Sequence, residues 1–142
     1  MKKGIIFTVI SLFAILLIAF FSIILQRIIW ANNAREYAPY NYPNTTWVCE
    51  EPQIEYNVPA GVGEAIAVTE INGKEVCFFF GTNNSHVDAV RYSSDNVIKD
   101  SDLLLTGSIS YSKDEFIIKI DKNSDKLFDG KYDVLVFERD DK

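Results

Sequence analysis

The stretch that decides the fold is residues 103–120, LLLTGSISYSKDEFIIKI. Two sets of alternating positions run through its first ten residues, one mostly large and apolar and one small and polar. The first set is Leu103, Leu105, Gly107, Ile109 and Tyr111, and the second is Thr106, Ser108, Ser110 and Ser112. This period of two is typical of a β-strand with one buried and one solvated face. After a reversal at residues 112–114, the segment 116–120 repeats the pattern, so we expect two consecutive strands.

Further strand-like segments fill most of the chain after residue 45. They are residues 47–51, 53–58, 64–71, 74–82, 87–93 and 132–139. Asn72-Gly73 suits a two-residue type I′ hairpin, because both central residues of that turn need a positive φ. We therefore predict an all-β domain with one antiparallel meander of about eight strands. Short links favour a small barrel, and a two-layer β-sandwich is the alternative.

The N-terminal segment is a long apolar run. Gly4–Leu25 has 22 residues without a charge, Pro, Asn or Gln. As a helix it would reach about 33 Å, close to the roughly 30 Å hydrocarbon core of a bilayer. We predict a single-pass transmembrane helix whose partner is the lipid bilayer through residues 4–25. The alternative is a cleaved signal peptide, but the run is longer than a usual signal core and no A-x-A-like cleavage site follows it.

The flanks of the apolar run predict an orientation. Lys2 and Lys3 precede it, whereas Arg27 and Arg35 follow it with Glu36 close by. Because cytoplasmic flanks are the more basic ones, we expect the N-terminus in the cytoplasm and the bulk of the chain outside the cell membrane.

The expected domain organisation has three parts. Residues 1–30 form the anchor, and Arg27 and Trp30 lie at the membrane interface. Residues 31–44, which include Asn, Pro and Tyr and lack an apolar period, predict a non-helical stalk. Residues 45–142 form the extracytoplasmic β domain, which is long enough for one core.

Charge argues against two kinds of partner. All 20 acidic residues but only 10 of the 14 basic ones lie from Glu36 onward, so this part has a formal charge of −10. Nucleic acids and anionic lipid faces attract basic patches, so we expect no nucleic-acid partner and no adsorption of this part to an anionic lipid face. A solvated acidic surface is the simplest interpretation.

The two cysteines, Cys49 and Cys77, both lie in apolar strand-like segments. Outside the cytoplasm such a pair most simply forms a disulfide, which we take as the candidate. The alternative is two buried free thiols that pack as small hydrophobic side chains.

The segment 121–132 contains a partial calcium-loop pattern. Asp121, Asn123, Asp125 and Asp129 match relative positions 1, 3, 5 and 9 of such a loop. Lys126 stands where the loop needs Gly, however, and Tyr132 where it needs a bidentate Glu. We therefore expect a solvated acidic loop, no metal site and no cofactor.

Catalytic motifs are also lacking. His86, the single histidine, follows a turn, and the sequence has no G-x-S-x-G nucleophile elbow. Carboxylates are frequent, as in any acidic domain, so they indicate no particular chemistry. We expect a protein that is not an enzyme.

Two segments support a resemblance to a group of proteins. The domain opens with PNTTWVCEEP at residues 43–52 and closes with DGKYDVLVFER at residues 129–139. With the basic start and the single apolar run, this resembles uncharacterised small exported or membrane-anchored β proteins of Gram-positive bacteria, a group that implies no activity. A resemblance to lipocalin-like barrels is weaker, because Thr45-Thr46-Trp47 stands where that family has Gly-x-Trp.

Two functions remain open. The first is a tethered, non-catalytic binding module that holds an unknown ligand or cell-envelope protein in the barrel mouth or on its loops. The second is an accessory subunit whose helix packs against another membrane protein. The apolar run has no G-x-x-x-G pattern, which favours the first function.

Overall fold

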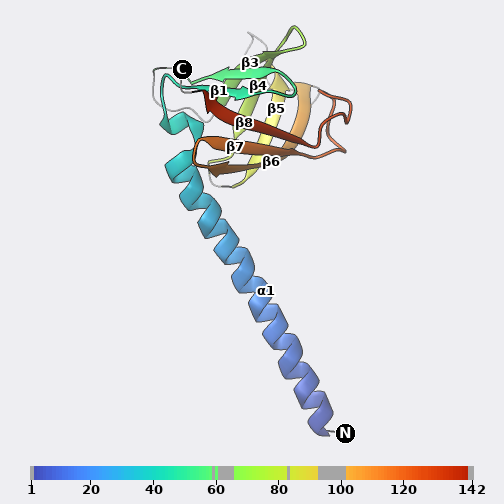
Figure 1. The fold of residues 1–142 in the computed structure, drawn as a ribbon. Helices are drawn as coiled ribbons and strands as arrows, with labels where there is room; N and C mark the ends of the chain where they lie inside the picture. The colour runs from blue at the N-terminus through green and yellow to red at the C-terminus, as the bar shows by residue number, and fades with distance from the viewer. Residues whose placement is uncertain (1, 59, 61–65, 83, 93–101, 141–142) are drawn as a thin grey trace.

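The computed structural model of the chain describes residues 2–58, 60, 66–82, 84–92 and 102–140. One long helix projects from a small β domain (Figure 1). The helix, α1, spans Lys2–Tyr37, and a short 3-10 helix, η1, spans Pro39–Asn41. The strands are β1 (Thr46–Cys49), β2 (Ile54–Asn57), β3 (Ile66–Ile71), β4 (Lys74–Phe80), β5 (His86–Arg91), β6 (Leu103–Ser112), β7 (Glu115–Ile120) and β8 (Val134–Asp140).

The eight strands form one antiparallel sheet in the order β2-β1-β8-β7-β6-β5-β4-β3. The sheet curls until its two edge strands, β2 and β3, lie beside each other. Across this seam, the hydroxyl of Thr69 donates a hydrogen bond of 2.7 Å to the Glu55 carbonyl. The predicted fold class, an apolar helix followed by an all-β barrel-like meander, is confirmed. The Asn72-Gly73 turn is also confirmed, with φ values of 53° and 73°.

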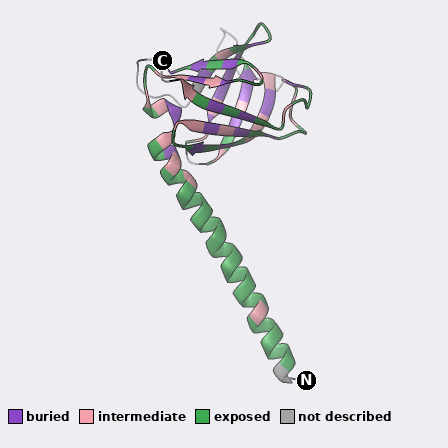
Figure 2. Ribbon diagram, viewed as in Figure 1, coloured by how far each residue is buried: buried purple, intermediate pink, exposed green. Residues whose placement is uncertain are grey.

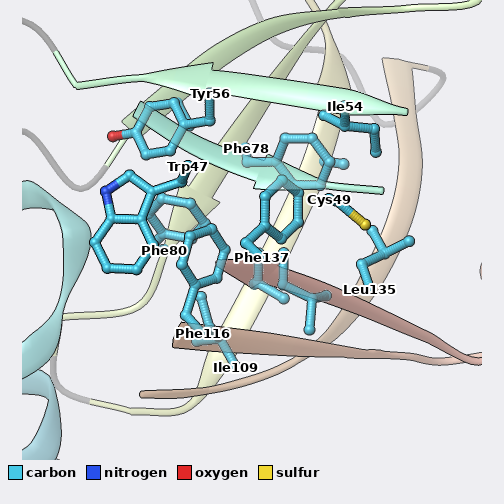
Figure 3. Packing of buried hydrophobic residues seen from close by; sticks show 14 of the residues in the cluster. Trp47, Cys49, Ile54, Tyr56, Phe78, Phe80, Ile109, Phe116, Leu135 and Phe137 are labelled. Atoms are coloured by element: carbon cyan, nitrogen blue, oxygen red, sulfur yellow. The ribbon is translucent and has the colours of Figure 1, made fainter. Parts of the chain in front are cut away.

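Buried and exposed residues alternate along the strands (Figure 2). On β6, Leu105 and Ile109 are buried, whereas Ser108 and Ser110 are exposed. Aromatic rings occupy the centre of the interior (Figure 3). Phe116 stacks on Phe137 with ring centroids 4.5 Å apart and also contacts Trp47 at 5.4 Å.

The end of α1 belongs to the folded domain. Trp30, Ala34 and Ala38 recur every fourth residue and so share one side of the helix, which faces the barrel. Ala34 and Ala38 are 4% and 0% exposed, and their small side chains allow close approach. The prediction of a non-helical stalk is therefore wrong for residues 31–37. Two alanines and a tryptophan are too weak an apolar stripe to reveal this contact in the sequence.

Polar side chains close the C-terminal end of α1. Pro39 disfavours a helical conformation at Ala38, whose ψ is 139°. The last carbonyl groups of a helix need partners from outside it. The amide of Asn41 donates to the Ala34 and Arg35 carbonyls, and the Tyr42 hydroxyl donates to the Glu36 carbonyl at 2.7 Å. The direction in which α1 leaves the barrel is thus set by specific contacts.

Candidate functional site

The barrel interior is filled with side chains. At the β2–β3 seam, a cavity of ≈ 10 Å³ remains between Ile54, Tyr56, Phe78 and Phe80. That is about the space needed by one water molecule, far below the roughly 300 Å³ of a small-molecule pocket. This cavity is therefore too small for a ligand, and the described interior around the seam is occupied by side chains.

Side chains also cover both ends of the barrel. At the end next to α1, the Trp30 ring lies 6.1 Å from that of Tyr111, and Tyr40 lies 6.4 Å from it. At the opposite end, Phe128 belongs to the buried core, and Tyr132 packs edge-on against it at 5.3 Å. We call the end opposite α1 the distal rim; its described parts are residues 50–53, 72–73 and 121–133.

The candidate calcium loop has another role. One carboxylate oxygen of Asp125 accepts hydrogen bonds from the backbone N–H groups of Leu127 (3.0 Å) and Phe128 (2.9 Å), and the other accepts from Gly130 at 2.8 Å. The Asp121 carboxylate accepts from the Asn123 N–H in the same way. Among the described residues, no group of three metal-ligating side chains gathers here or elsewhere. Of the four residues in the calcium-loop pattern, Asp121, Asn123, Asp125 and Asp129, two thus use their carboxylates to fold the loop: Asp121 and Asp125 bind its backbone.

This loop is also tied to the barrel wall. The Ser124 hydroxyl lies 2.9 Å from the Thr106 backbone nitrogen and 2.8 Å from the Thr106 hydroxyl. The Lys126 N–H donates to the Leu104 carbonyl at 2.7 Å. Asp125 shapes the loop and Ser124 attaches it to β6, so the distal rim has a defined surface.

The distal rim contains a shallow pocket of ≈ 180 Å³. Three turns line it, and its residues are Pro52, Asn72, Leu127, Phe128, Asp129, Lys131 and Tyr132. The Lys131 ammonium lies 5.1 Å from the centre of the Tyr132 ring. The pocket combines a half-buried aromatic ring with amide, carboxylate and ammonium groups. Sequence reasoning missed it, because its residues come from turns far apart in the chain.

The cysteine pair does not form the expected disulfide. Both thiols are free and buried. Cys49 belongs to the core inside the barrel. On β4, Val76 and Phe78 also belong to this core, and Cys77 lies between them in the sequence. Successive side chains of a strand point to opposite faces, so the two thiols lie on opposite sides of the barrel wall. Burial raises the pKa of both thiols, which fits the alternative of packed, unreactive cysteines.

One cluster on the outer wall resembles part of a catalytic triad. The His86 ring lies 2.9 Å from the Asp88 carboxylate, and Ser108 is opposite His86 in the β5–β6 register. No hydrogen bond joins Ser108 to His86 among the described residues, and the His86 side chain is 55% exposed. The cluster therefore lacks the serine-to-histidine hydrogen bond through which a catalytic triad activates its serine.

The two predicted membrane-interface residues have different surroundings. The Trp30 indole N–H donates a hydrogen bond of 2.8 Å to the Ile109 carbonyl on β6, so this ring serves to dock the helix. Arg27 is exposed and lines a groove between α1 and the β4–β5 loop. Within the described chain, α1 is the one helix long and apolar enough to cross a membrane.

Comparisons with protein-family models, with characterised proteins and with solved structures find no match to this chain. The fold and the surface together define a filled, capped β-barrel on a long apolar helix.

Proposed function

We propose that this protein is a non-catalytic binding module of the cell envelope, held at the membrane by α1 with its barrel outside the cytoplasm. The observation that carries the proposal is the junction between α1 and the barrel. The apolar segment of α1 is not buried against any other part of the described chain. The C-terminal end of the same helix nevertheless packs into the barrel core through Ala34 and the following Ala38. Continuous apolar surface of this extent needs a bilayer or a partner to cover it.

The junction also favours an uncleaved anchor over a signal peptide. Cleavage near residue 30 would remove Trp30, which hydrogen-bonds to Ile109 and packs against Tyr111. A removable leader has no need of such contacts with the mature domain. The basic pair Lys2 and Lys3 supports a cytoplasmic N-terminus.

Because the barrel interior is filled, we place the binding surface for a partner on the distal rim. Its pocket of ≈ 180 Å³ is smaller than the roughly 300 Å³ lower limit of a typical small-molecule site. It suits one side chain or one sugar unit of a larger partner. A surface held away from the bilayer by a fixed barrel is well placed to contact an envelope component.

Cysteine labelling tests the topology. Ser112→Cys places a thiol on the exposed face of β6, and Lys3→Cys places one before the span. In intact cells, a membrane-impermeant maleimide should label Ser112→Cys, whereas Lys3→Cys should react only after lysis. The wild-type chain is the control, because its buried cysteines should stay unlabelled until the protein is denatured. Labelling of the two variants in the opposite order would refute the orientation, and release of the barrel into the medium would refute the anchor.

Photo-crosslinking tests the recognition surface. A photoreactive residue at Lys131, on the distal rim, should capture an envelope component in intact cells, and Tyr132→Ala should reduce that capture. The same group at Ser112, at the α1 end, is the matched control and should not capture it. If capture instead occurred only from positions within α1, the function as an accessory subunit would replace the binding module.

A further inference from the structure

A groove lies between α1 and the loop that joins β4 to β5. It is open and has a volume of ≈ 800 Å³. The lining residues are Ile23, Gln26, Arg27, Ile28, Trp30, Ala31, Asn84 and Ser85. The groove therefore combines side chains from the apolar segment with polar side chains of the barrel.

Residue Ile109 of β6 holds the two walls of this groove together. Its N–H donates to the Ser85 carbonyl at 2.7 Å, and its carbonyl accepts the Trp30 indole N–H at 2.8 Å. The first bond positions the β4–β5 loop and the second positions α1. Because both bonds use the backbone of one strand residue, the spacing of the walls is fixed by the barrel.

The groove lies at the depth of lipid headgroups when residues 4–25 span a bilayer. Ile23 is then within the hydrocarbon core, and Arg27 is two residues beyond its end. Trp30 follows Leu25 by five residues, or about 7.5 Å of helix, and each headgroup layer is about 5–7.5 Å thick. Asn84 and Ser85 line the same groove opposite these helix residues.

The polar groups of the groove suit an anion. Arg27 is the one charged residue among the described residues that line it. The Asn84 side-chain oxygen already accepts the His86 N–H at 3.0 Å, which leaves its NH₂ group to donate. The Ser85 hydroxyl is a further donor. A guanidinium with neighbouring donors matches phosphate oxygens, and Ile23 and Ile28 can contact an acyl chain.

We propose that this groove seats the headgroup of an anionic phospholipid, with its phosphate at Arg27 and its acyl chain along Ile23. This inference rests on the proposed membrane anchor. It adds a specific lipid site, which fixes the height and the rotation of the barrel above the bilayer.

Native mass spectrometry of the full chain in mild detergent tests the site. Dioleoyl phosphatidylglycerol and dioleoyl phosphatidylcholine are added separately at matched concentrations. The wild type should retain phosphatidylglycerol in preference to phosphatidylcholine. Arg27→Gln should weaken the apparent affinity for phosphatidylglycerol by about fivefold, the effect of one basic residue at an anionic surface. Ser85→Ala, which keeps the backbone bond to Ile109, should weaken it less.

The matched control is Arg35→Gln, which removes an exposed arginine of the same helix outside the groove and should leave lipid retention unchanged. Equal retention of the two lipids, or equal loss in both arginine variants, would overturn the lipid site. Displacement of the lipid by millimolar inorganic phosphate would show a general anion site and overturn it as well. Alkaline carbonate washing of vesicles tests the anchor separately, because Arg27→Gln should remain membrane-integrated even where its lipid preference is lost.

Discussion

At the residue scale, two tyrosine hydroxyls are buried where hydrogen-bond partners are scarce. Tyr56 and Tyr111 are each 3% exposed, and neither hydroxyl has a partner among the described residues. Figure 3 shows the Tyr56 hydroxyl directed toward the α1 end of the barrel. An unsatisfied buried hydroxyl costs about 1–3 kcal/mol. The buried rings of both residues therefore stabilise the folded state, whereas their unsatisfied hydroxyls destabilise it.

Removing the Tyr111 hydroxyl should stabilise the protein. We expect Tyr111→Phe to raise the free energy of unfolding by about 1 kcal/mol, because the ring stays and the unsatisfied group is lost. Tyr42→Phe is the matched control: its hydroxyl donates to the Glu36 carbonyl, so its loss should cost about 0.5–1.5 kcal/mol. Urea unfolding of the full chain in mild detergent measures both. Destabilisation of equal size in the two variants would mean that a buried water satisfies Tyr111.

Alkaline pH should weaken the fold through the same residues. Burial raises the pKa of Tyr56 from 10.0 to about 12 and also raises that of Tyr111. The unfolded chain thus loses these protons near pH 10, while the folded barrel keeps them. Each such group lowers stability by about 1.4 kcal/mol per pH unit above pH 10, and for Tyr56 the loss ends near pH 12. Unfolding free energies at several pH values should show a shallower decline in Tyr56→Phe; curves parallel to wild type would contradict the assignment.

At the element scale, β6 is the strand that connects the parts of the molecule. It pairs with β5 and β7, accepts the indole of Trp30, and binds Ser124 of the distal loop through Thr106. A Cβ at Gly107 would collide with the Lys119 carbonyl on β7, so glycine permits the close approach of these strands. From Leu105 onward, the alternation along β6 buries Leu105, Ile109 and Tyr111 and leaves Ser108, Ser110 and Ser112 exposed; Leu104 is buried as well, next to the register shift with β5.

The two faces of β6 should respond differently to truncation. Leu105→Ala should lower the free energy of unfolding by about 2–5 kcal/mol, because Leu105 is 0% exposed and a cavity would remain. Ser108→Ala, on the exposed face of the same strand, should change it by less than about 0.5 kcal/mol. Denaturant titration compares them directly. Similar losses at both positions would show that a further layer or partner covers the outer wall.

At the scale of the whole molecule, α1 has two parts: a long exposed apolar segment, and a C-terminal end that covers one end of the barrel. These contacts join the barrel to α1, so with α1 in a bilayer, as proposed, the distal rim should point in a defined direction relative to it. This coupling depends on Trp30, whose ring contacts Tyr111 and whose N–H reaches Ile109.

Trp30→Ala should loosen the whole molecule without unfolding it. We expect a loss of about 3 kcal/mol of stability, near the lower end for a tryptophan truncation because the ring is half-buried. Spin labels at Ser22 on α1 and Lys119 on β7 should give a narrow distance distribution in the wild type and a broad one in Trp30→Ala. Arg35→Ala, exposed on the same helix, is the control and should stay narrow. Equal widths in all three proteins would refute the rigid junction.

The sequence by itself determined the elements of this protein. A two-residue period is visible wherever one strand face is buried, and Asn72-Gly73 encodes its turn through its own φ preferences, so the all-β meander could be predicted. The apolar run of residues 4–25 identified α1, although not its last turns at residues 31–37. These signals are local, since each depends on residues within one element or one turn.

Only the tertiary structure decided which of these residues meet. The disulfide prediction was wrong because the strand registers place Cys49 inside the barrel and Cys77 on its outer side. The prediction that residues 31–37 are non-helical was wrong, because Ala34 and Ala38 become apolar contacts only once the barrel end lies against them. Asp125 accepts hydrogen bonds from backbone N–H groups of its own loop. The distal pocket is assembled from distant turns, and the groove from α1 and the β4–β5 loop. Long-range contacts of this kind arise from the curvature and closure of the sheet, which no local pattern in the sequence records.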